Sequence, residues 1–158
     1  MVAPSISVQT GPELEAVMHQ LIPISVQMGL SVSHYDGSTL ELQAPLAPNI
    51  NHQSSAFGGS LLAGCALAGW GLLQLQLGHL GRLGNVVVAE AESKFLAPVY
   101  TSLRVRCDLP DNFFDLRSQL IEKGSKSMRV TALVHDGLEE AVAMQVDARY
   151  VIRLNDDA

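Results

Sequence analysis

Apolar and polar residues alternate along much of this chain, and the pattern predicts a β-rich domain. Strict alternation is typical of strands that bury one face of a sheet and leave the other in water. It occurs in six segments, at residues 30–33, 40–44, 87–95, 103–109, 128–135 and 142–152. Asp36-Gly37 and Asp136-Gly137 are tight-turn signals, so the first and last pairs are predicted hairpins.

The third segment is predicted to bury one side only. The residues expected on its buried face are Val87, Ala89, Ala91 and Phe95. The residues expected on its opposite face are Glu90, Glu92 and Lys94. This assignment assumes an unbroken period of two.

Three segments are predicted to be helical. Pro12 begins the first, acidic residues occupy its first turn, and Pro23 ends it. A short helix is expected at residues 112–122, between the fourth and fifth strands. The longest segment, residues 57–77, contains no charged residue. A helix that is apolar all round is either a buried core helix or a membrane span.

The buried helix is the preferred interpretation of residues 57–77. The run is shorter than the ~20 apolar residues that a span needs, it contains several glycines, and no Lys or Arg cluster flanks it. We therefore predict no membrane span and an α+β fold, in which an antiparallel sheet of about six strands wraps around one long central helix. Residues 1–23 form an N-terminal lead-in and helix, and residues 24–154 form the main domain.

The composition of the chain predicts a partner subunit. Charged residues make up 16% of the 158 residues, against the ~25% that is usual, so part of the apolar surface is expected to be covered by another subunit. The net charge of −6 argues against binding to nucleic acid, which needs a basic face. The start of the chain lacks a signal-peptide pattern, and two cysteines do not form a disulfide framework, so a cytoplasmic protein is expected. The five histidines show no metal-ligand spacing, and no metal site is predicted.

The junction before the long helix is the strongest candidate for chemistry. A polar stretch, residues 51–55, leads into Phe57-Gly58-Gly59-Ser60. A helix N-terminus presents unpaired N–H groups and a partial positive charge, and glycines let a ligand oxygen approach them closely. Gly58 and Gly59 are thus candidates for an oxyanion hole. The alternative is structural: the glycines permit tight packing, and Ser55 caps the helix.

The same junction resembles a known family. The segments that carry the resemblance are Asn49-Ile50-Asn51-His52, Phe57-Gly58-Gly59-Ser60-Leu61 and Leu67-Ala68-Gly69-Trp70-Gly71-Leu72. They are similar to the YiiD C-terminal thioesterase domain of the hot-dog superfamily, and Lys94-Phe95-Leu96-Ala97-Pro98-Val99 resembles a segment common in hot-dog thioesterases. The resemblance implies hydrolysis of acyl thioesters of coenzyme A or acyl carrier protein, with no cofactor. It also implies a homodimer or homotetramer whose sheets pair side by side.

The resemblance places the thioester carbonyl near Gly58 and Gly59, with Phe57 and Ser60 beside the substrate. Many hot-dog thioesterases carry an acidic residue on the central helix, and this chain has none there. Asn51 can orient a water molecule but cannot take its proton at neutral pH. His52 and a glutamate of the third strand, Glu92 or Glu90, are the candidate bases, and the choice stays open.

A second polar segment and several alternatives complete the prediction. Lys123, Gly124 and Lys126 form the densest basic patch and are candidates for binding the nucleotide phosphates of coenzyme A; a solvated turn is the alternative.

Cys65 and Ser60 are weak candidates for a nucleophile. The competing functions are an acyl-binding or carrier-docking module without activity, and a dehydratase or hydratase.

Overall fold

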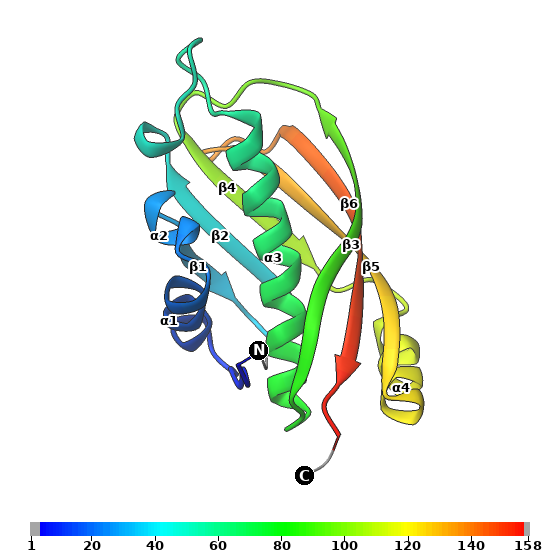
Figure 1. Cartoon of the computed structure of the whole chain (residues 1–158). Helices are drawn as coiled ribbons and strands as arrows, with labels where there is room; N and C mark the ends of the chain where they lie inside the picture. Colours follow the sequence, from blue (N-terminus) through cyan, green and yellow to red (C-terminus); the bar gives the residue numbers. More distant parts are fainter. Residues whose placement is uncertain (1–3, 157–158) are drawn as a thin grey trace.

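A six-stranded antiparallel sheet forms the frame of the molecule. The computed structural model describes residues 4–156. The strands follow the order β1-β2-β4-β5-β6-β3 across the sheet (Figure 1). Their bounds are β1 Ser31–Tyr35, β2 Thr39–Pro45, β3 Gly84–Phe95, β4 Ser102–Asp108, β5 Ser125–Asp136 and β6 Val142–Leu154. The predicted fold class and all six predicted strands are confirmed.

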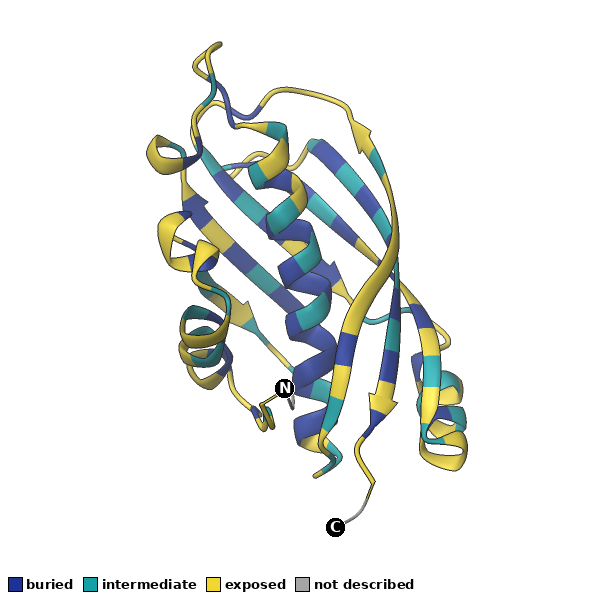
Figure 2. Ribbon diagram, in the orientation of Figure 1, coloured by how far each residue is buried: buried dark blue, intermediate teal, exposed yellow. Residues whose placement is uncertain are grey.

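The long uncharged segment is helix α3, Gly58–His79, which packs along the sheet. Its C-terminal two thirds are mostly buried, whereas its first turn is open to solvent (Figure 2). Gly69 lets Tyr150 of β6 approach the helix: a Cβ at Gly69 would lie 2.2 Å from the Tyr150 hydroxyl, which donates a hydrogen bond of 2.8 Å to the Ala66 carbonyl. By length and hydropathy α3 resembles a membrane-spanning helix, but 67% of its most apolar window is buried inside this chain. The core therefore accounts for its apolar sequence.

The remaining helices lie around this core. They are α1 Gly11–Leu21, α2 Ile24–Gln27, the 3-10 turn η1 Ala47–Asn49, and α4 Phe113–Lys123. Thr10 and Glu13 form a capping box at the start of α1, as favoured at helix N-termini. Helices α1 and α4 match their predictions, and of the predicted lead-in, residues 1–3 lie outside the described part. The prediction missed α2 and η1, which turn out to form one wall of the candidate site.

Strand β3 is an edge strand, and its predicted facing was partly wrong. Val88 pairs with Tyr150 and Glu90 with Arg149, so Ala89 is an extra residue in a β-bulge. The bulge shifts the alternation by one position. Val87 therefore lies on the same side of the sheet as Glu90 and Glu92, on the face away from α3, while Ala91 and Phe95 lie on the helix side as predicted.

Candidate functional site

Helix α3 begins without a side-chain cap. Its N-cap residue is Phe57, with extended backbone angles of φ −63° and ψ 129°. The amides of Ser60 and Leu61 donate to the Phe57 carbonyl at 2.9 and 3.2 Å. Within residues 4–156, neither the Gly58 nor the Gly59 amide has an acceptor. Two N–H groups thus remain available at the positive end of the helix dipole.

The structural alternative for Ser55 is wrong. Ser55 is buried and does not cap α3; its amide and hydroxyl donate to Asn51 Oδ1 at 3.1 and 3.2 Å. The amide of Gln53 donates to the same oxygen at 2.9 Å. Asn51 is consequently the organiser of the tight loop before α3, and its acceptor atom is already occupied. Its Nδ2 makes a longer bond, 3.4 Å, to the Ala56 carbonyl.

Two backbone hydrogen bonds hold the junction in place. The Ala56 amide donates to the Val99 carbonyl at 2.8 Å, and the Phe57 amide donates to the Asn49 carbonyl at 2.7 Å. The first ties the loop to the segment after β3, and the second ties it to η1. The start of α3 is therefore fixed between these two neighbours.

A cavity lies on each side of this fixed helix start. The α2 cavity, of about 330 Å³, lies toward α2 and η1 and contacts α3 at Gly59, Ser60 and Ala63. The β3 cavity, of about 370 Å³, lies toward the end of β3. It is lined by Gln53, Ser55, Ala56, Gly58, Leu61, Phe95, Leu96, Ala97 and Pro98. Gly59 thus lines one cavity and Gly58 the other, and the two cavities meet the same helix terminus from different sides.

Two aromatic rings cover the glycines. A Cβ at Gly59 would lie 2.3 Å from Cε1 of Phe57, and a Cβ at Gly58 would lie 3.1 Å from Cε1 of Phe95. Both rings are more than half exposed. The two glycines thus leave room for the far ends of these exposed rings to lie against the helix start.

Asn49 is a site residue that the sequence did not single out. Its side chain is 2% exposed and lines the α2 cavity. Its Nδ2 donates to the carbonyls of Met28 and Pro45, at 2.9 and 2.8 Å, so the end of α2 is tied to the end of β2. Its Oδ1 is buried without a hydrogen-bond partner within residues 4–156. Of the two asparagines in the Asn49-Ile50-Asn51 segment, Asn49 therefore has the unoccupied acceptor.

The candidate bases lie outside both cavities. His52 is exposed on the loop that Asn51 organises, next to Gln53 of the β3 cavity. Glu92 pairs with Asp147 between two helix-facing pairs, so it lies on the face of the sheet opposite α3. Among the described residues lining the two cavities, none is Asp, Glu or His.

The basic patch lies far from the helix start within one chain. Ser125 pairs with Arg153 and Gly84 pairs with Leu154, so β5 and β3 begin at the same end of the sheet. Phe95, beside Gly58, is at the other end of β3, about 35 Å away at ~3.3 Å per residue. Lys123 is exposed in the last turn of α4, Gly124 is its left-handed C-cap, and the Lys126 amine donates to Gln119 at 2.6 Å. Within one chain, the basic patch and Gly58 therefore cannot contact the same part of a substrate.

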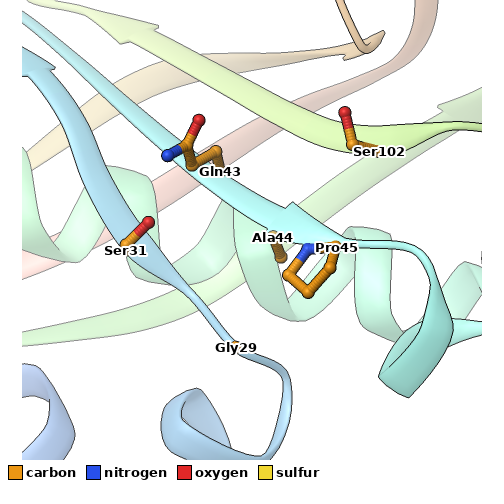
Figure 3. A pocket seen from close by; sticks show the side chains of 6 residues that line it. All are labelled: Gly29, Ser31, Gln43, Ala44, Pro45 and Ser102. Carbon is orange, nitrogen blue, oxygen red and sulfur yellow. The ribbon is translucent and has the colours of Figure 1, made fainter.

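Other features offer less chemistry. A hollow of about 250 Å³ on the β1, β2 and β4 side is lined by Gly29, Ser31, Gln43, Ala44, Pro45 and Ser102, none of them ionisable. In Figure 3 the polar groups of Ser31, Gln43 and Ser102 point to one side of the strands. Burial raises the pKa of the Cys65 thiol to about 12, so this cysteine stays protonated and is a poor nucleophile. The described residues contain no group of three or more His, Cys, Asp or Glu side chains suited to a metal ion.

Comparisons with known proteins place the fold and the family. The chain superimposes with a TM-score of 0.85 on a protein of unknown function from Chlorobaculum tepidum, at 32% identity, covering 93% of this chain and 98% of that one. A Shewanella oneidensis protein described as a "putative thioesterase" gives a TM-score of 0.80 at 29% identity, covering 89% and 95%. A Pseudomonas aeruginosa protein at 21% identity, covering 94% and 99%, shares the fold with a TM-score of 0.80. The sequence model of the family described as "Putative thioesterase (yiiD_Cterm)" matches residues 12–154, and this chain belongs to that family.

Proposed function

We propose that this protein hydrolyses acyl thioesters of coenzyme A or acyl carrier protein. The observation that carries the proposal is the uncapped start of α3, where the Gly58 and Gly59 amides are free between two cavities. The thioester carbonyl oxygen accepts hydrogen bonds from these amides. Water then attacks the carbonyl carbon, and the negative charge that develops on the oxygen is stabilised by the amides and the helix dipole. The carbon–sulfur bond breaks, the thiol leaves with a proton, and a carboxylic acid remains.

Proton transfer is assigned to a group outside α3. His52 is the first candidate, because it lies on the loop that enters the helix and an imidazole serves as a base at neutral pH. Glu92 is the second. Its carboxylate points to the sheet face opposite α3 of its own chain, so a role for Glu92 requires a site shared between subunits.

We further propose that the protein is a homodimer joined through β3. This strand is 12 residues long, lies at the sheet edge and exposes Val87, Val88 and Phe95. A long apolar edge strand in water promotes uncontrolled pairing, and natural proteins cover such edges. A two-fold axis at β3 pairs the strands antiparallel, so the beginning of one β3 lies beside the end of its partner, next to Gly58. A tetramer remains the alternative assembly, and the predicted cytoplasmic location fits substrates of this kind.

An acyl-binding module without activity is the second candidate function. The observation that favours it is the lack of any carboxylate or imidazole among the lining residues of the two cavities within residues 4–156. Such a module would keep the free amides to hold a carbonyl, with no group to move a proton.

Release of free thiol from a series of acyl-CoA esters, from acetyl to palmitoyl, separates the two candidates. A hydrolase turns over at least part of the series, and the acyl-carrier-protein thioesters are tested in the same assay. Binding of the same esters without thiol release in either form identifies the binding module. His52→Ala is then compared with His52→Gln: loss of turnover in both, with unchanged folding, supports His52 as the base.

A further inference from the structure

The α2 cavity has a largely apolar lining, as an acyl chain requires. It begins at the free Gly59 amide and continues along α3 to Ala63, one turn further on the same face of the helix. Its apolar lining residues are Ile24, Met28, Pro48 and Phe57, and Gln27 and Asn49 add polar groups. None of the described lining residues is ionisable. A hydrocarbon chain attached to a carbonyl at Gly59 thus meets apolar side chains from its first carbons onward.

The β3 cavity differs in character. It is lined by the polar side chains of Gln53 and Ser55 as well as by apolar residues, and its far wall, Phe95 to Pro98, is exposed to solvent. Amide-containing arms such as the pantetheine of coenzyme A and of acyl carrier protein need hydrogen-bond partners and a path to the surface. The two sides of a thioester therefore match the two sides of the helix start.

Asn49 is the buried polar residue in the wall of the α2 cavity. Its two Nδ2 bonds fix the wall of the cavity by joining Met28 to Pro45, while its Oδ1 is buried with no partner within residues 4–156. A buried acceptor without a partner is unfavourable, and natural proteins retain such groups at sites that have another purpose. The cavity wall is thus fixed in position, and its polar residues are Gln27, Asn49 and Ser60.

We propose that the α2 cavity takes the acyl chain of the substrate and that Ala63 sets the chain length, the preferred chain being of medium length. The proposal rests on the function proposed above. A cavity of about 330 Å³ holds on the order of ten chain atoms, if a methylene group is taken as similar in size to a water molecule at ~30 Å³. Octanoyl thioesters are accordingly the expected optimum. Acetyl groups leave the cavity unfilled, and palmitoyl chains extend from it into solvent past the half-exposed side chains of Ile24 and Phe57.

Binding of non-hydrolysable thioethers tests the chamber independently of catalysis. S-octyl-CoA and S-methyl-CoA are titrated calorimetrically into wild type, Ala63→Leu and Ala66→Leu. The last is the matched control, because Ala66 is a partly exposed residue on the same helix that does not line the cavity. Ala63→Leu is expected to weaken binding of S-octyl-CoA by about 10-fold or more, since single methylene groups in apolar pockets change discrimination by ~10–200-fold. Its affinity for S-methyl-CoA and both affinities of Ala66→Leu stay near wild type.

Each outcome decides between the proposals. If Ala63→Leu and Ala66→Leu bind S-octyl-CoA equally well, or if wild type binds it no more tightly than S-methyl-CoA, the chamber is elsewhere. If the expected binding pattern appears but no thioester is hydrolysed, the chamber stands and the hydrolase proposal fails. Should Ala63→Leu fail to fold, Ile24→Ala removes the opposite wall at a residue that is already 55% exposed, and it is expected to weaken S-octyl-CoA binding selectively.

Discussion

Replacing Gly58 by proline removes one of the two free amides and leaves the helix intact. Gly58 is the first residue of α3, the position where proline is most favoured in helices because its missing N–H has no partner there. The residue before a proline must be extended, and Phe57 already has φ −63° and ψ 129°. Gly58→Ala is the matched control: it also adds a Cβ, 3.1 Å from Cε1 of the exposed Phe95 ring, but keeps the N–H group.

The expected loss follows from the number of donors. Removing one oxyanion-hole donor in other enzymes costs ~10²–10³ in kcat, which corresponds to ~2.7–4 kcal/mol. Since the Gly59 amide remains beside Gly58, we expect Gly58→Pro to lower kcat by about 100-fold relative to Gly58→Ala. Stability is expected to change little, because the Gly58 amide makes no hydrogen bond within residues 4–156.

Thiol release measured with a chromogenic disulfide reagent gives kcat and KM for both variants. The reagent background is low, since Cys65 and Cys107 are both buried and burial raises the pKa of each thiol. Thermal unfolding by circular dichroism verifies that the variants are equally folded. If Gly58→Pro keeps a kcat close to that of Gly58→Ala, the Gly58 amide does not polarise the carbonyl and this assignment is refuted.

Three further predictions concern the loop, the core and the acid response. Asn51→Ala is expected to lower both stability and turnover, because the Gln53 amide and the Ser55 amide and hydroxyl lose their acceptor. Asn51→Asp keeps an acceptor oxygen and is expected to retain most of both in the same assays. Equal loss in the two variants would indicate a chemical role for the amide. Gly69→Ala is expected to reduce the free energy of unfolding in urea by about 1–3 kcal/mol, since its Cβ would overlap Tyr150. Gly64→Ala, whose Cβ would lie 3.2 Å from Cγ2 of Val105, is expected to change it less. Hydrogen bonds from backbone amides hold the pKa of Asp36 well below its ordinary 3.8. Its contribution to stability is therefore present above about pH 4 and is lost as the pH falls below that value. In measurements of the free energy of unfolding against pH, Asp36→Asn should reduce the loss of stability at acid pH.

Most of the fold was predictable because alternation and length carry the information. Strands β2, β4, β5 and β6 bury largely alternate residues, and a run of 21 uncharged residues indicates a core helix or a membrane span. The short helix α2 and the turn η1 were missed, since four and three residues are too few to show a helical period. The predicted facing of Val87 was wrong because Ala89 forms a bulge, so the residues before it and the residues after it follow opposite alternations. The composition of the strand does not reveal such a bulge.

The candidate site was predictable only in part. The Gly58-Gly59 pair follows from the physics of helix termini, which depends on local sequence alone. The choice between Asn49 and Asn51 depends on which neighbours occupy each side chain, and that is decided by residues as distant as Met28. The separation of Lys123 and Lys126 from the helix start likewise depends on strand order, which alternation does not reveal.

The lack of charge on α3 is better understood as part of the site than as a missing residue. A carboxylate one turn into the helix would lie near the carbonyl oxygen and would oppose the negative charge that develops there. In the proposed mechanism, an uncharged α3 lets the helix dipole and the two amides act on that oxygen without opposition from within the helix. The same arrangement leaves the proton to a group outside the helix, so the pH dependence of turnover should report that group. A profile that changes in His52→Gln and stays the same in Glu92→Gln would assign the base to the loop, and the reverse result would assign it to the strand and require a site formed by two subunits.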